Sequence, residues 1–169
     1  MDVRRADHTD AVALAAVDAA AFPVAYGQWL PPSALRDFTS ATGTDRWRKR
    51  IAAQDDVTAV WVAVLDGVVM AHAWSRPWTD TADLLPGAAK LNTLYVRPEH
   101  QGRGVGSRLL RHTCAWLRTA QIPEAALWVV EANVRARRFY ERQGWTLDQG
   151  VGKQWRGLSE VRYRVRLRY

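Results

Sequence analysis

Hydrophobic and polar residues alternate along this chain with two different periods, and each period predicts one kind of secondary structure. The strictest alternation with period two closes the chain. There the apolar residues Val161, Tyr163, Val165, Leu167 and Tyr169 are separated by Arg162, Arg164, Arg166 and Arg168. Because successive side chains of a strand point to opposite faces, we expect a strand with one face on the core and one basic face.

Shorter runs of apolar and β-branched residues predict further strands. Two of them, Val57–Leu65 and Val68–Trp74, are separated only by Asp66-Gly67, a strong signal for a two-residue hairpin. The others are Val3–Arg5, Leu91–Val96, Ala125–Val130 and a strand that starts at Trp145–Leu147. A loop is expected over Ser75–Ala89, which contains two prolines and a glycine.

Apolar residues spaced three and four apart predict two helices in the second half of the chain. The first continues to about Thr119 on the stripe Gly106, Leu109, Leu110, Thr113, Cys114 and Leu117. This stripe assigns Cys114 to the core and not to nucleophilic chemistry. The second helix is Val134–Gln143, with Gly144 well placed as the residue that follows its C-cap.

The first half of the chain has weaker helical signals. Thr9–Ala21 is rich in alanine, with Thr9 or Asp10 as N-cap candidates and an apolar stripe of Val12, Ala15, Ala16 and Ala19. Thr44–Gln54 also has helical spacing. Between them Pro23–Gly43 is expected to be irregular, with Ser33 capping a short helix through Phe38.

The stretch from Leu91 to Leu110 combines a strand, a turn and a helix that begins with glycines. Gly102, Gly104 and Gly106 stand where the helix starts. Free N–H groups and the positive end of the helix dipole make such a start a binding site for a phosphate group. The P-loop pattern is absent, and the dinucleotide pattern G-x-G-x-x-G fails because Ser107 stands at its last position.

The pattern that fits is Gln101-x-x-Gly104-x-Gly106, which resembles the pyrophosphate loop of the GCN5-related N-acetyltransferase (GNAT) superfamily. A second segment, from Asn133 through Ala136 to Tyr140, resembles the N-x-x-A-x-x-x-Y motif of that superfamily. The resemblance implies an α/β (α+β) fold over a single domain, residues 1–169. It implies a mixed, mostly antiparallel sheet of about six to seven strands flanked by about four helices.

The resemblance also implies an activity and a set of site residues. The enzyme would move an acetyl group from acetyl-CoA to a primary amine by direct attack in a ternary complex. Tyr140 would protonate the departing thiolate. Backbone N–H groups of Leu94, Tyr95 and Val96 would bind pantetheine and polarise the carbonyl. The pyrophosphate would be held by Gln101, Gly102, Arg103, Gly104, Val105, Gly106 and Ser107, with added charge from Arg108.

Two of the assignments in the second segment, those of Asn133 and Tyr140, keep a structural alternative. Asn133 would hydrogen-bond the pantetheine arm, and it is equally suited to be the helix N-cap. Ala136 would leave room for the thiol end of the cofactor. Tyr140 shares the helix face of Ala136 and is alternatively a core aromatic with a satisfied hydroxyl.

The general base is not defined by the resemblance. Many members of the superfamily carry Glu where Lys90 stands here. We expect Glu131 to serve, because it lies two residues before Asn133 and so on the same face of a strand. His72 and a base acting through water are the alternatives. The histidines at positions 8, 72, 100 and 112 have no ligand spacing, so no metal is expected.

Charge is unevenly distributed within a net charge of +7. Residues 1–89 contain 8 Lys and Arg against 11 Asp and Glu, whereas residues 90–169 contain 16 against 6. A basic half suits anionic coenzyme A, and an acidic half suits a cationic acceptor. Aromatic walls for that acceptor are expected from Tyr26, Trp29, Phe38, Trp47, Trp74 and Trp78.

Composition limits the partners. With 48% hydrophobic residues, one cysteine and no secretory signal, the chain is expected to be a cytoplasmic monomer or homodimer with no disulfide. No apolar run approaches the roughly 20 residues of a membrane span, so no membrane partner is expected. The acceptor is expected to be a small-molecule or peptide amine. A non-catalytic coenzyme A sensor is the alternative, followed by a basic nucleic-acid-binding protein, for which no known motif is present.

Overall fold

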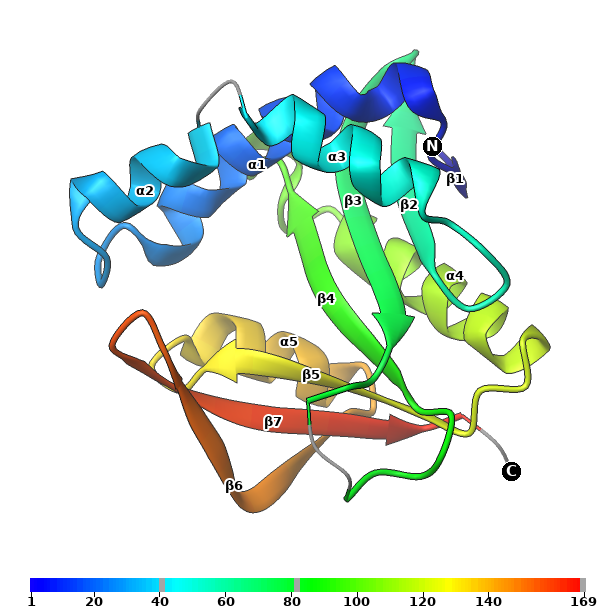
Figure 1. Cartoon of the computed structure of the whole chain (residues 1–169). Helices are drawn as coiled ribbons and strands as arrows, with labels where there is room; N and C mark the ends of the chain where they lie inside the picture. The colour runs from blue at the N-terminus through cyan, green and yellow to red at the C-terminus, as the bar shows by residue number, and fades with distance from the viewer. Residues whose placement is uncertain (40–41, 81–82, 168–169) are drawn as a thin grey trace.

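A computed structural model of the chain describes residues 1–39, 42–80 and 83–167. Its elements appear in Figure 1 in chain order. The strands are β1 Asp2–Arg5, β2 Ala59–Leu65, β3 Val68–Pro77, β4 Ala89–Val96, β5 Glu124–Val130, β6 Thr146–Trp155 and β7 Leu158–Arg166. The α-helices are α1 Ala11–Tyr26, α2 Pro32–Thr39, α3 Thr42–Ala52, α4 Val105–Thr119 and α5 Val134–Arg142. Short 3₁₀ turns cover His8–Asp10 and Pro98–His100.

All seven strands form one sheet in the order β1-β2-β3-β4-β5-β7-β6. Every neighbouring pair is antiparallel except β4 and β5, which run parallel. The predicted mixed, mostly antiparallel sheet is therefore confirmed. The predicted hairpin is confirmed too, since Asp66 and Gly67 have φ values of 51° and 77°, as a type I′ turn requires.

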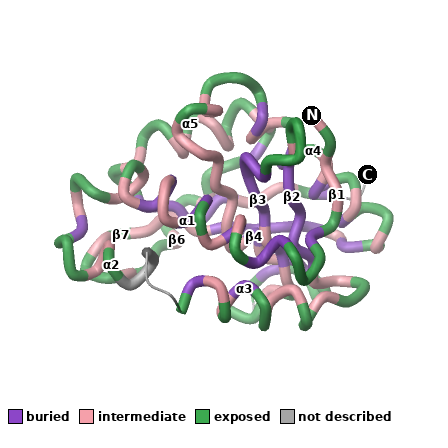
Figure 2. Tube along the Cα trace, turned by 90° about the horizontal axis from the view of Figure 1, so that it is seen from above, coloured by how far each residue is buried: buried purple, intermediate pink, exposed green. Residues whose placement is uncertain are grey.

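Helices cover both faces of the sheet, and each face has its own core. On one face α4 packs its predicted stripe, including Leu109, Leu110 and Leu117, against the alanines of β2 and β3. On the other face α1 and α3 pack against Val60, Val62 and Val69. The central strands β2 and β3 are consequently the most continuously buried part of the chain (Figure 2). Burial raises the pKa of Cys114 to about 11, in line with a core thiol.

Helix α1 differs from the sequence prediction in its phase and its length. Val12 is 63% exposed, whereas Leu14, Val17, Asp18 and Phe22 are buried. An alanine-rich helix is apolar on nearly every side, so its sequence does not show which side packs on the sheet. The polar Asp18 made the side that is buried look like a solvent-exposed one. The helix also continues through Pro23 to Tyr26, because Phe22 and Tyr26 extend the apolar contact.

The helix starts differ as well. The capping box of the first turn belongs to Asp7, whose carboxylate accepts a hydrogen bond from the N–H of Thr9, while Asp10 accepts from the N–H of Asp7. Ser33 is the second residue of α2 and not its cap. By length and hydropathy the segment from residue 8 to residue 26 would pass as a membrane span, but its buried face packs on the sheet, which accounts for that hydropathy.

Strand β7 carries the predicted alternation with one correction. Tyr163 and Leu167 are buried as expected, and Tyr169 lies outside the described residues. Arg162, expected on an open basic face, is only 1% exposed. Its Nε donates to Asp148 Oδ2 at 2.8 Å and its Nη1 to Asp83 Oδ1 at 2.9 Å. A buried guanidinium needs such partners, and the acidic residues that supply them are distant in sequence.

We predict that Gly144→Ala destabilises the fold by about 1–2 kcal/mol, the cost of a left-handed conformation for a residue with a side chain. Gly144 has a φ of 83°, and an added Cβ would meet no atom within 4 Å, so only backbone strain is introduced. Its N–H and that of Trp145 donate to Glu141 O and Tyr140 O, closing α5. Urea denaturation measures the change. Gln143→Ala, at a φ of −93°, is the control and should cost less than about 0.5 kcal/mol.

Candidate functional site

The site begins where β4 and β5 separate. These parallel strands pair only through Ala89 with Ala125 and Lys90 with Ala126. Directly after this point β4 contains a bulge, because Trp74 pairs with Thr93 whereas Ser75 pairs with Leu91, which leaves Asn92 as the extra residue. A bulge bends a strand and increases its twist, so it turns β4 away from β5. The remainder of β4 therefore has an edge that no strand in the described part of the chain covers.

Hydrogen bonding fixes which groups of β4 face this open edge. The N–H of Arg97 donates to Met70 O in β3, and Tyr95 pairs with His72 in the same register. Antiparallel pairs alternate, so the amides of Tyr95 and Thr93 point to β3, while those of Leu94 and Val96 point to the open edge. The predicted backbone contacts of Leu94 and Val96 thus have free access, and that of Tyr95 does not.

The side chains of β4 divide between the two faces of the sheet. Leu94 and Val96 face Gly106 of α4. A Cβ added to Gly106 would lie 3.6 Å from Leu94 Cδ2 and 3.4 Å from Val96 Cγ2. A Cβ at this position would be in van der Waals contact with both side chains, so a larger side chain would have no room between α4 and β4. Thr93 and Tyr95 face the opposite side, toward α1. The open edge is therefore accessible from both faces.

The glycine loop lies at the end of β4. Gly102 and Gly104 have φ values of 75° and 79°, in the region that glycine adopts without strain. Helix α4 begins at Val105, so these two glycines belong to the turn and only Gly106 to the helix. Gln101 Nε2 donates to Val96 O at 3.0 Å and ties the loop to the strand. The first N–H groups of α4 have no partner within the helix.

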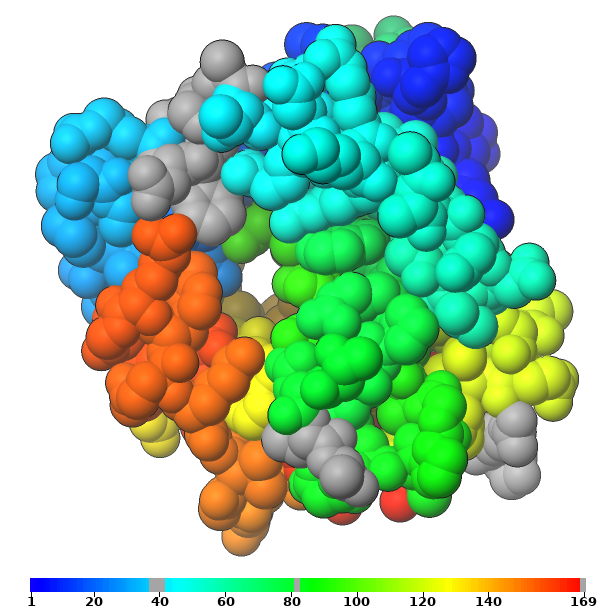
Figure 3. All heavy atoms as spheres, in the orientation of Figure 1, coloured from blue at the N-terminus to red at the C-terminus, as the bar shows by residue number. Residues whose placement is uncertain are grey.

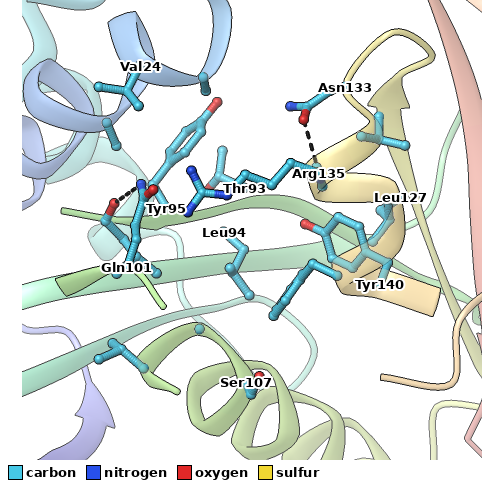
Figure 4. Close-up of a pocket in the computed structure, with 18 of the residues that line it drawn as sticks. Val24, Thr93, Leu94, Tyr95, Gln101, Ser107, Leu127, Asn133, Arg135 and Tyr140 are labelled. Atoms are coloured by element: carbon cyan, nitrogen blue, oxygen red, sulfur yellow. Dashed lines mark hydrogen bonds between the residues drawn. The ribbon is translucent and has the colours of Figure 1, made fainter. Parts of the chain in front are cut away.

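Helix α5 contributes the second predicted motif from the other side. Asn133 Oδ1 accepts a hydrogen bond from the N–H of Ala136 at 3.0 Å, so Asn133 is the N-cap. Its amide nitrogen lies on the side away from the helix (Figure 4). The ring of Tyr140 packs against Phe139 and Trp145. Burial, followed by the charge of Tyr26, raises the pKa of Tyr140 well above its ordinary value.

These segments enclose a cavity of about 650 Å³. It is open between the N-terminal helices, β4 and β6 on the face shown in Figure 3. The structure brings almost all predicted site residues to its wall. They are Leu94, Tyr95, Val96, Gln101, Gly102, Gly104, Val105, Gly106, Ser107, Asn133, Ala136 and Tyr140. Arg103 is exposed and lies outside the lining.

The prediction for Glu131 rested on a wrong premise. Strand β5 ends at Val130, and Glu131 is an exposed turn residue outside the cavity lining. It therefore does not share a strand face with Asn133, which stands in the turn before α5. Lys90 is also outside the cavity and forms an ion pair with Asp80. Burial, which outweighs this ion pair, lowers the pKa of Lys90.

Charge at the cavity also differs from the expectation. The described residues that line the cavity include three basic side chains, those of Arg135, Arg142 and His100. No Asp or Glu is among these lining residues. Arg135 reaches from α5 across the cavity toward β4 (Figure 4). Several acidic residues of the first half are paired elsewhere, as Asp10 is with Arg4. The described residues also contain no cluster of three His, Cys, Asp or Glu suited to a metal.

Of the aromatic residues expected around the acceptor, Tyr26 lines the cavity. Its ring lies 5.3 Å from that of Trp155, and the hydroxyl of Tyr95 donates to its hydroxyl at 3.4 Å. Trp47 and Trp74 belong to the core around α3, and Trp78 stacks on Trp128. The side chain of Phe38 lies outside the described part of the chain. Trp155 was missed because the hairpin that carries it is distant in sequence.

Comparison with known proteins identifies the family to which this chain belongs. The model of the acetyltransferase (GNAT) family matches residues 25–145. A probable N-acetyltransferase of Mycobacterium tuberculosis is 34% identical over 103 residues, which cover 61% of this chain and 55% of that protein. The chain spans about half the length of the curated relatives it matches, 60% and 55% for two of them.

Solved structures share the fold over almost the whole chain. The PaiA N-acetyltransferase of Thermoplasma acidophilum, in complex with coenzyme A, has a TM-score of 0.79 at 15% identity over 95% of this chain and 96% of that one. The acetyltransferase yncA of Salmonella typhimurium, with acetyl-CoA, has a TM-score of 0.78 at 21% identity over 100% and 95%. The fold expected from the sequence is thereby confirmed.

We predict that two substitutions of Asn133 separate its two roles. Asn133→Ser keeps an acceptor for the N–H of Ala136, so stability should change little, but it removes the amide donor. Losing one such hydrogen bond should weaken coenzyme A binding by up to about tenfold. Asn133→Ala should weaken binding similarly and also cost about 1 kcal/mol of stability. Calorimetry and thermal melting measure both effects. Unchanged affinity in the serine variant would make Asn133 a cap only.

Proposed function

The chain belongs to the acetyltransferase (GNAT) family, and we propose that it transfers the acetyl group of acetyl-CoA to a primary amine. The observation that carries this proposal is the separation of β4 from β5 after Lys90 and Ala126. It leaves the amides of Leu94 and Val96 free beside the glycine loop at the start of α4. A thioester with a long polar arm and a pyrophosphate suits this combination of groups.

In this proposal the donor lies along the open edge of β4. The amides from Gly102 to Ser107 hold the pyrophosphate, supported by the helix dipole and the charge of Arg103 and Arg108. Leu94 and Val96 pair with the pantetheine arm, and Asn133 donates to it. Gly106 suits this shape, because α4 and β4 leave room there for little more than a Cβ. Ala136 leaves room near the thioester.

The acetyl group moves by direct attack of the amine on the thioester carbonyl. Holding both substrates in one cavity supplies proximity. Backbone N–H groups at the β4 edge stabilise the developing negative charge on the carbonyl oxygen. Tyr140 gives its proton to the departing thiolate. Its raised pKa keeps the phenol protonated at neutral pH, as this role requires.

The acceptor enters on the side of α1, where Tyr26 and Trp155 offer aromatic faces. A small-molecule or peptide amine suits this opening. The absence of a carboxylate among the described lining residues removes the expected acidic contact for a strongly cationic acceptor. Aromatic faces still attract a single ammonium group.

The decisive experiment is an acetyl-transfer screen with the full chain. Coenzyme A release from acetyl-CoA is followed with a thiol reagent for aminoglycosides, polyamines, amino acids and peptide N-termini. Amine-dependent thiol release supports an acetyltransferase. Tight coenzyme A binding with no release for any amine class would instead support a non-catalytic sensor.

We predict that Gly104→Val weakens coenzyme A binding by at least about tenfold, equivalent to about 1.4 kcal/mol. Gly104 has a φ of 79°, and a branched side chain there would strain the loop and cover its amides. Gly67→Val, at a φ of 77° in the hairpin between β2 and β3, is the matched control for backbone strain. Calorimetry should show parental affinity for the control. Equal affinity of the Gly104 variant and the parent would exclude this loop as the pyrophosphate site.

We predict that Tyr140→Phe lowers kcat by about 10²-fold and leaves coenzyme A affinity nearly unchanged. The substitution keeps the ring that packs on Phe139 and Trp145 and removes only the hydroxyl. Because the pKa of Tyr140 is raised, the phenol of the parent stays protonated beyond pH 10, so its ionisation should cause no loss of rate up to that pH. Unchanged kcat where chemistry limits the rate would assign thiolate protonation to water.

A further inference from the structure

A buried polar cluster lies between α1 and the sheet, within an otherwise apolar core. Asp18 is 3% exposed and His72 is fully buried. Asp18 Oδ1 lies 2.8 Å from His72 Nε2, and Asp18 Oδ2 accepts from Trp47 Nε1 at 2.7 Å. The ring of Trp47 also packs edge-on against that of His72 at 4.5 Å. Asp18 of α1 and Trp47 of α3 thus hold the imidazole of His72, which is in β3, in one orientation.

The cluster reaches the cavity through one hydroxyl. Thr93 Oγ1 lies 3.5 Å from His72 Nδ1, the ring nitrogen opposite to the one that Asp18 contacts. Thr93 lines the cavity on the side of α1, and the next residue, Leu94, presents its amide to the open edge. A nucleophile approaching a carbonyl held at Leu94 from the α1 side would therefore meet Thr93. Hydrogen bonds of this kind are often long in the absence of substrate and shorten in the complex.

The cavity wall itself offers no other proton acceptor at this place. None of the described lining residues is a carboxylate. The phenols of Tyr26 and Tyr95 are unsuited, because burial raises the pKa of both and keeps them neutral acids. His100 precedes the glycine loop, beyond the end of β4, where the pyrophosphate is expected. A side-chain base for the amine would therefore act from behind the described part of this wall.

We propose that Thr93, His72 and Asp18 form a proton relay that removes a proton from the acceptor amine. This inference rests on the proposed acetyl transfer and adds the base that the sequence did not define. Thr93 is the residue that touches the amine. His72 and Asp18 act through it, in the order hydroxyl, imidazole, carboxylate.

The relay moves one proton in two linked transfers. The ammonium gives a proton to Thr93 Oγ as the Thr93 hydroxyl gives its own to His72 Nδ1. The freed amine then attacks the thioester carbon, the C–S bond breaks, and the thiolate takes a proton from Tyr140. After attack the nitrogen loses its second proton to solvent in the cavity, and one proton from that solvent restores the phenol of Tyr140. The imidazolium returns its proton to solvent along the same path.

The surroundings of His72 favour this direction of transfer. Burial alone would raise the pKa of Asp18, but the hydrogen bond and the charge interaction with His72, followed by the hydrogen bond from Trp47 and the charge of Arg46, outweigh it and lower that pKa. In a His72 that carries one proton, the hydrogen bond to an ionised Asp18 keeps that proton on Nε2 and leaves Nδ1 as the acceptor. The other charged groups nearby are Arg46 and Arg50 of α3, while Tyr95 of β4 stays neutral.

The test compares two nucleophiles of different charge in the full chain. 2-Phenylethylamine is an ammonium at neutral pH and needs a base, whereas benzhydrazide has a neutral terminal nitrogen. His72→Gln keeps a donor for Asp18 but takes up no proton. It and Thr93→Val should slow kcat for the amine by about 10²-fold and leave the hydrazide nearly unaffected. Thr93→Ser, which keeps the hydroxyl, should retain most of the rate. Equal slowing of both nucleophiles would reduce the cluster to a structural role.

A spectroscopic measurement tests the relay without any acceptor. In the ¹⁵N-labelled chain at neutral pH, His72 should carry its proton on Nε2 only, and Thr93→Val should shift the Nδ1 resonance. A proton on Nδ1, or on both nitrogens, would overturn the relay. Coenzyme A affinity and melting temperature identify a variant that fails to fold. A parent that acetylates neither nucleophile argues against the proposed function, and the ring-nitrogen spectra then decide the relay alone.

Discussion

The separation of β4 from β5 is the constraint on which the rest of the structure depends. After two pairs the strands part, and the bulge at Asn92 keeps them apart. A strand edge inside a protein carries N–H and C=O groups that must find partners. On β4 one carbonyl, that of Val96, is satisfied by Gln101, while the amides of Leu94 and Val96 face the cavity. The fold therefore presents a prepared hydrogen-bonding edge, and the glycine loop lies directly beyond it.

Because the opening lies within the sheet, each face of the sheet supplies a different chemistry. The α4 side is built from glycine and apolar residues, which suits close approach of a long ligand to the backbone. The α1 side supplies the hydroxyls of Thr93, Tyr95 and Tyr26. Two arginines and no carboxylate stand among the described lining residues. Positive charge near an amine disfavours its protonated form, so this cavity assists deprotonation where an acidic one would oppose it.

Sequence patterns predicted correctly those parts of the structure that depend on residues close together in the sequence. The spacing of Gln101, Gly104 and Gly106 and that of Asn133, Ala136 and Tyr140 brought nearly every expected residue to one cavity. The apolar residues of α4 lie on one side of the helix, and the prediction that this side is buried was confirmed. Helix α1 is apolar on most sides, so its phase depends on the sheet it meets. Asp83, a partner of Arg162, and Asp18, the partner of His72, are 79 and 54 residues distant, and no local pattern indicates such contacts.

Two buried charged clusters show what separates a structural cluster from one that serves chemistry. Arg162 with Asp83 and Asp148 ties β7 to β6 and to the loop before β4, away from the cavity. Asp18 with His72 ties α1 to β3. Removing the acidic partners of Arg162, or removing His72 from Asp18, would leave a buried charge with fewer partners, which destabilises a fold. Burial and pairing are thus common to both. Only the second has a hydroxyl, that of Thr93, between its imidazole and the open edge of β4, and this position gives its proton a path to the reacting atoms.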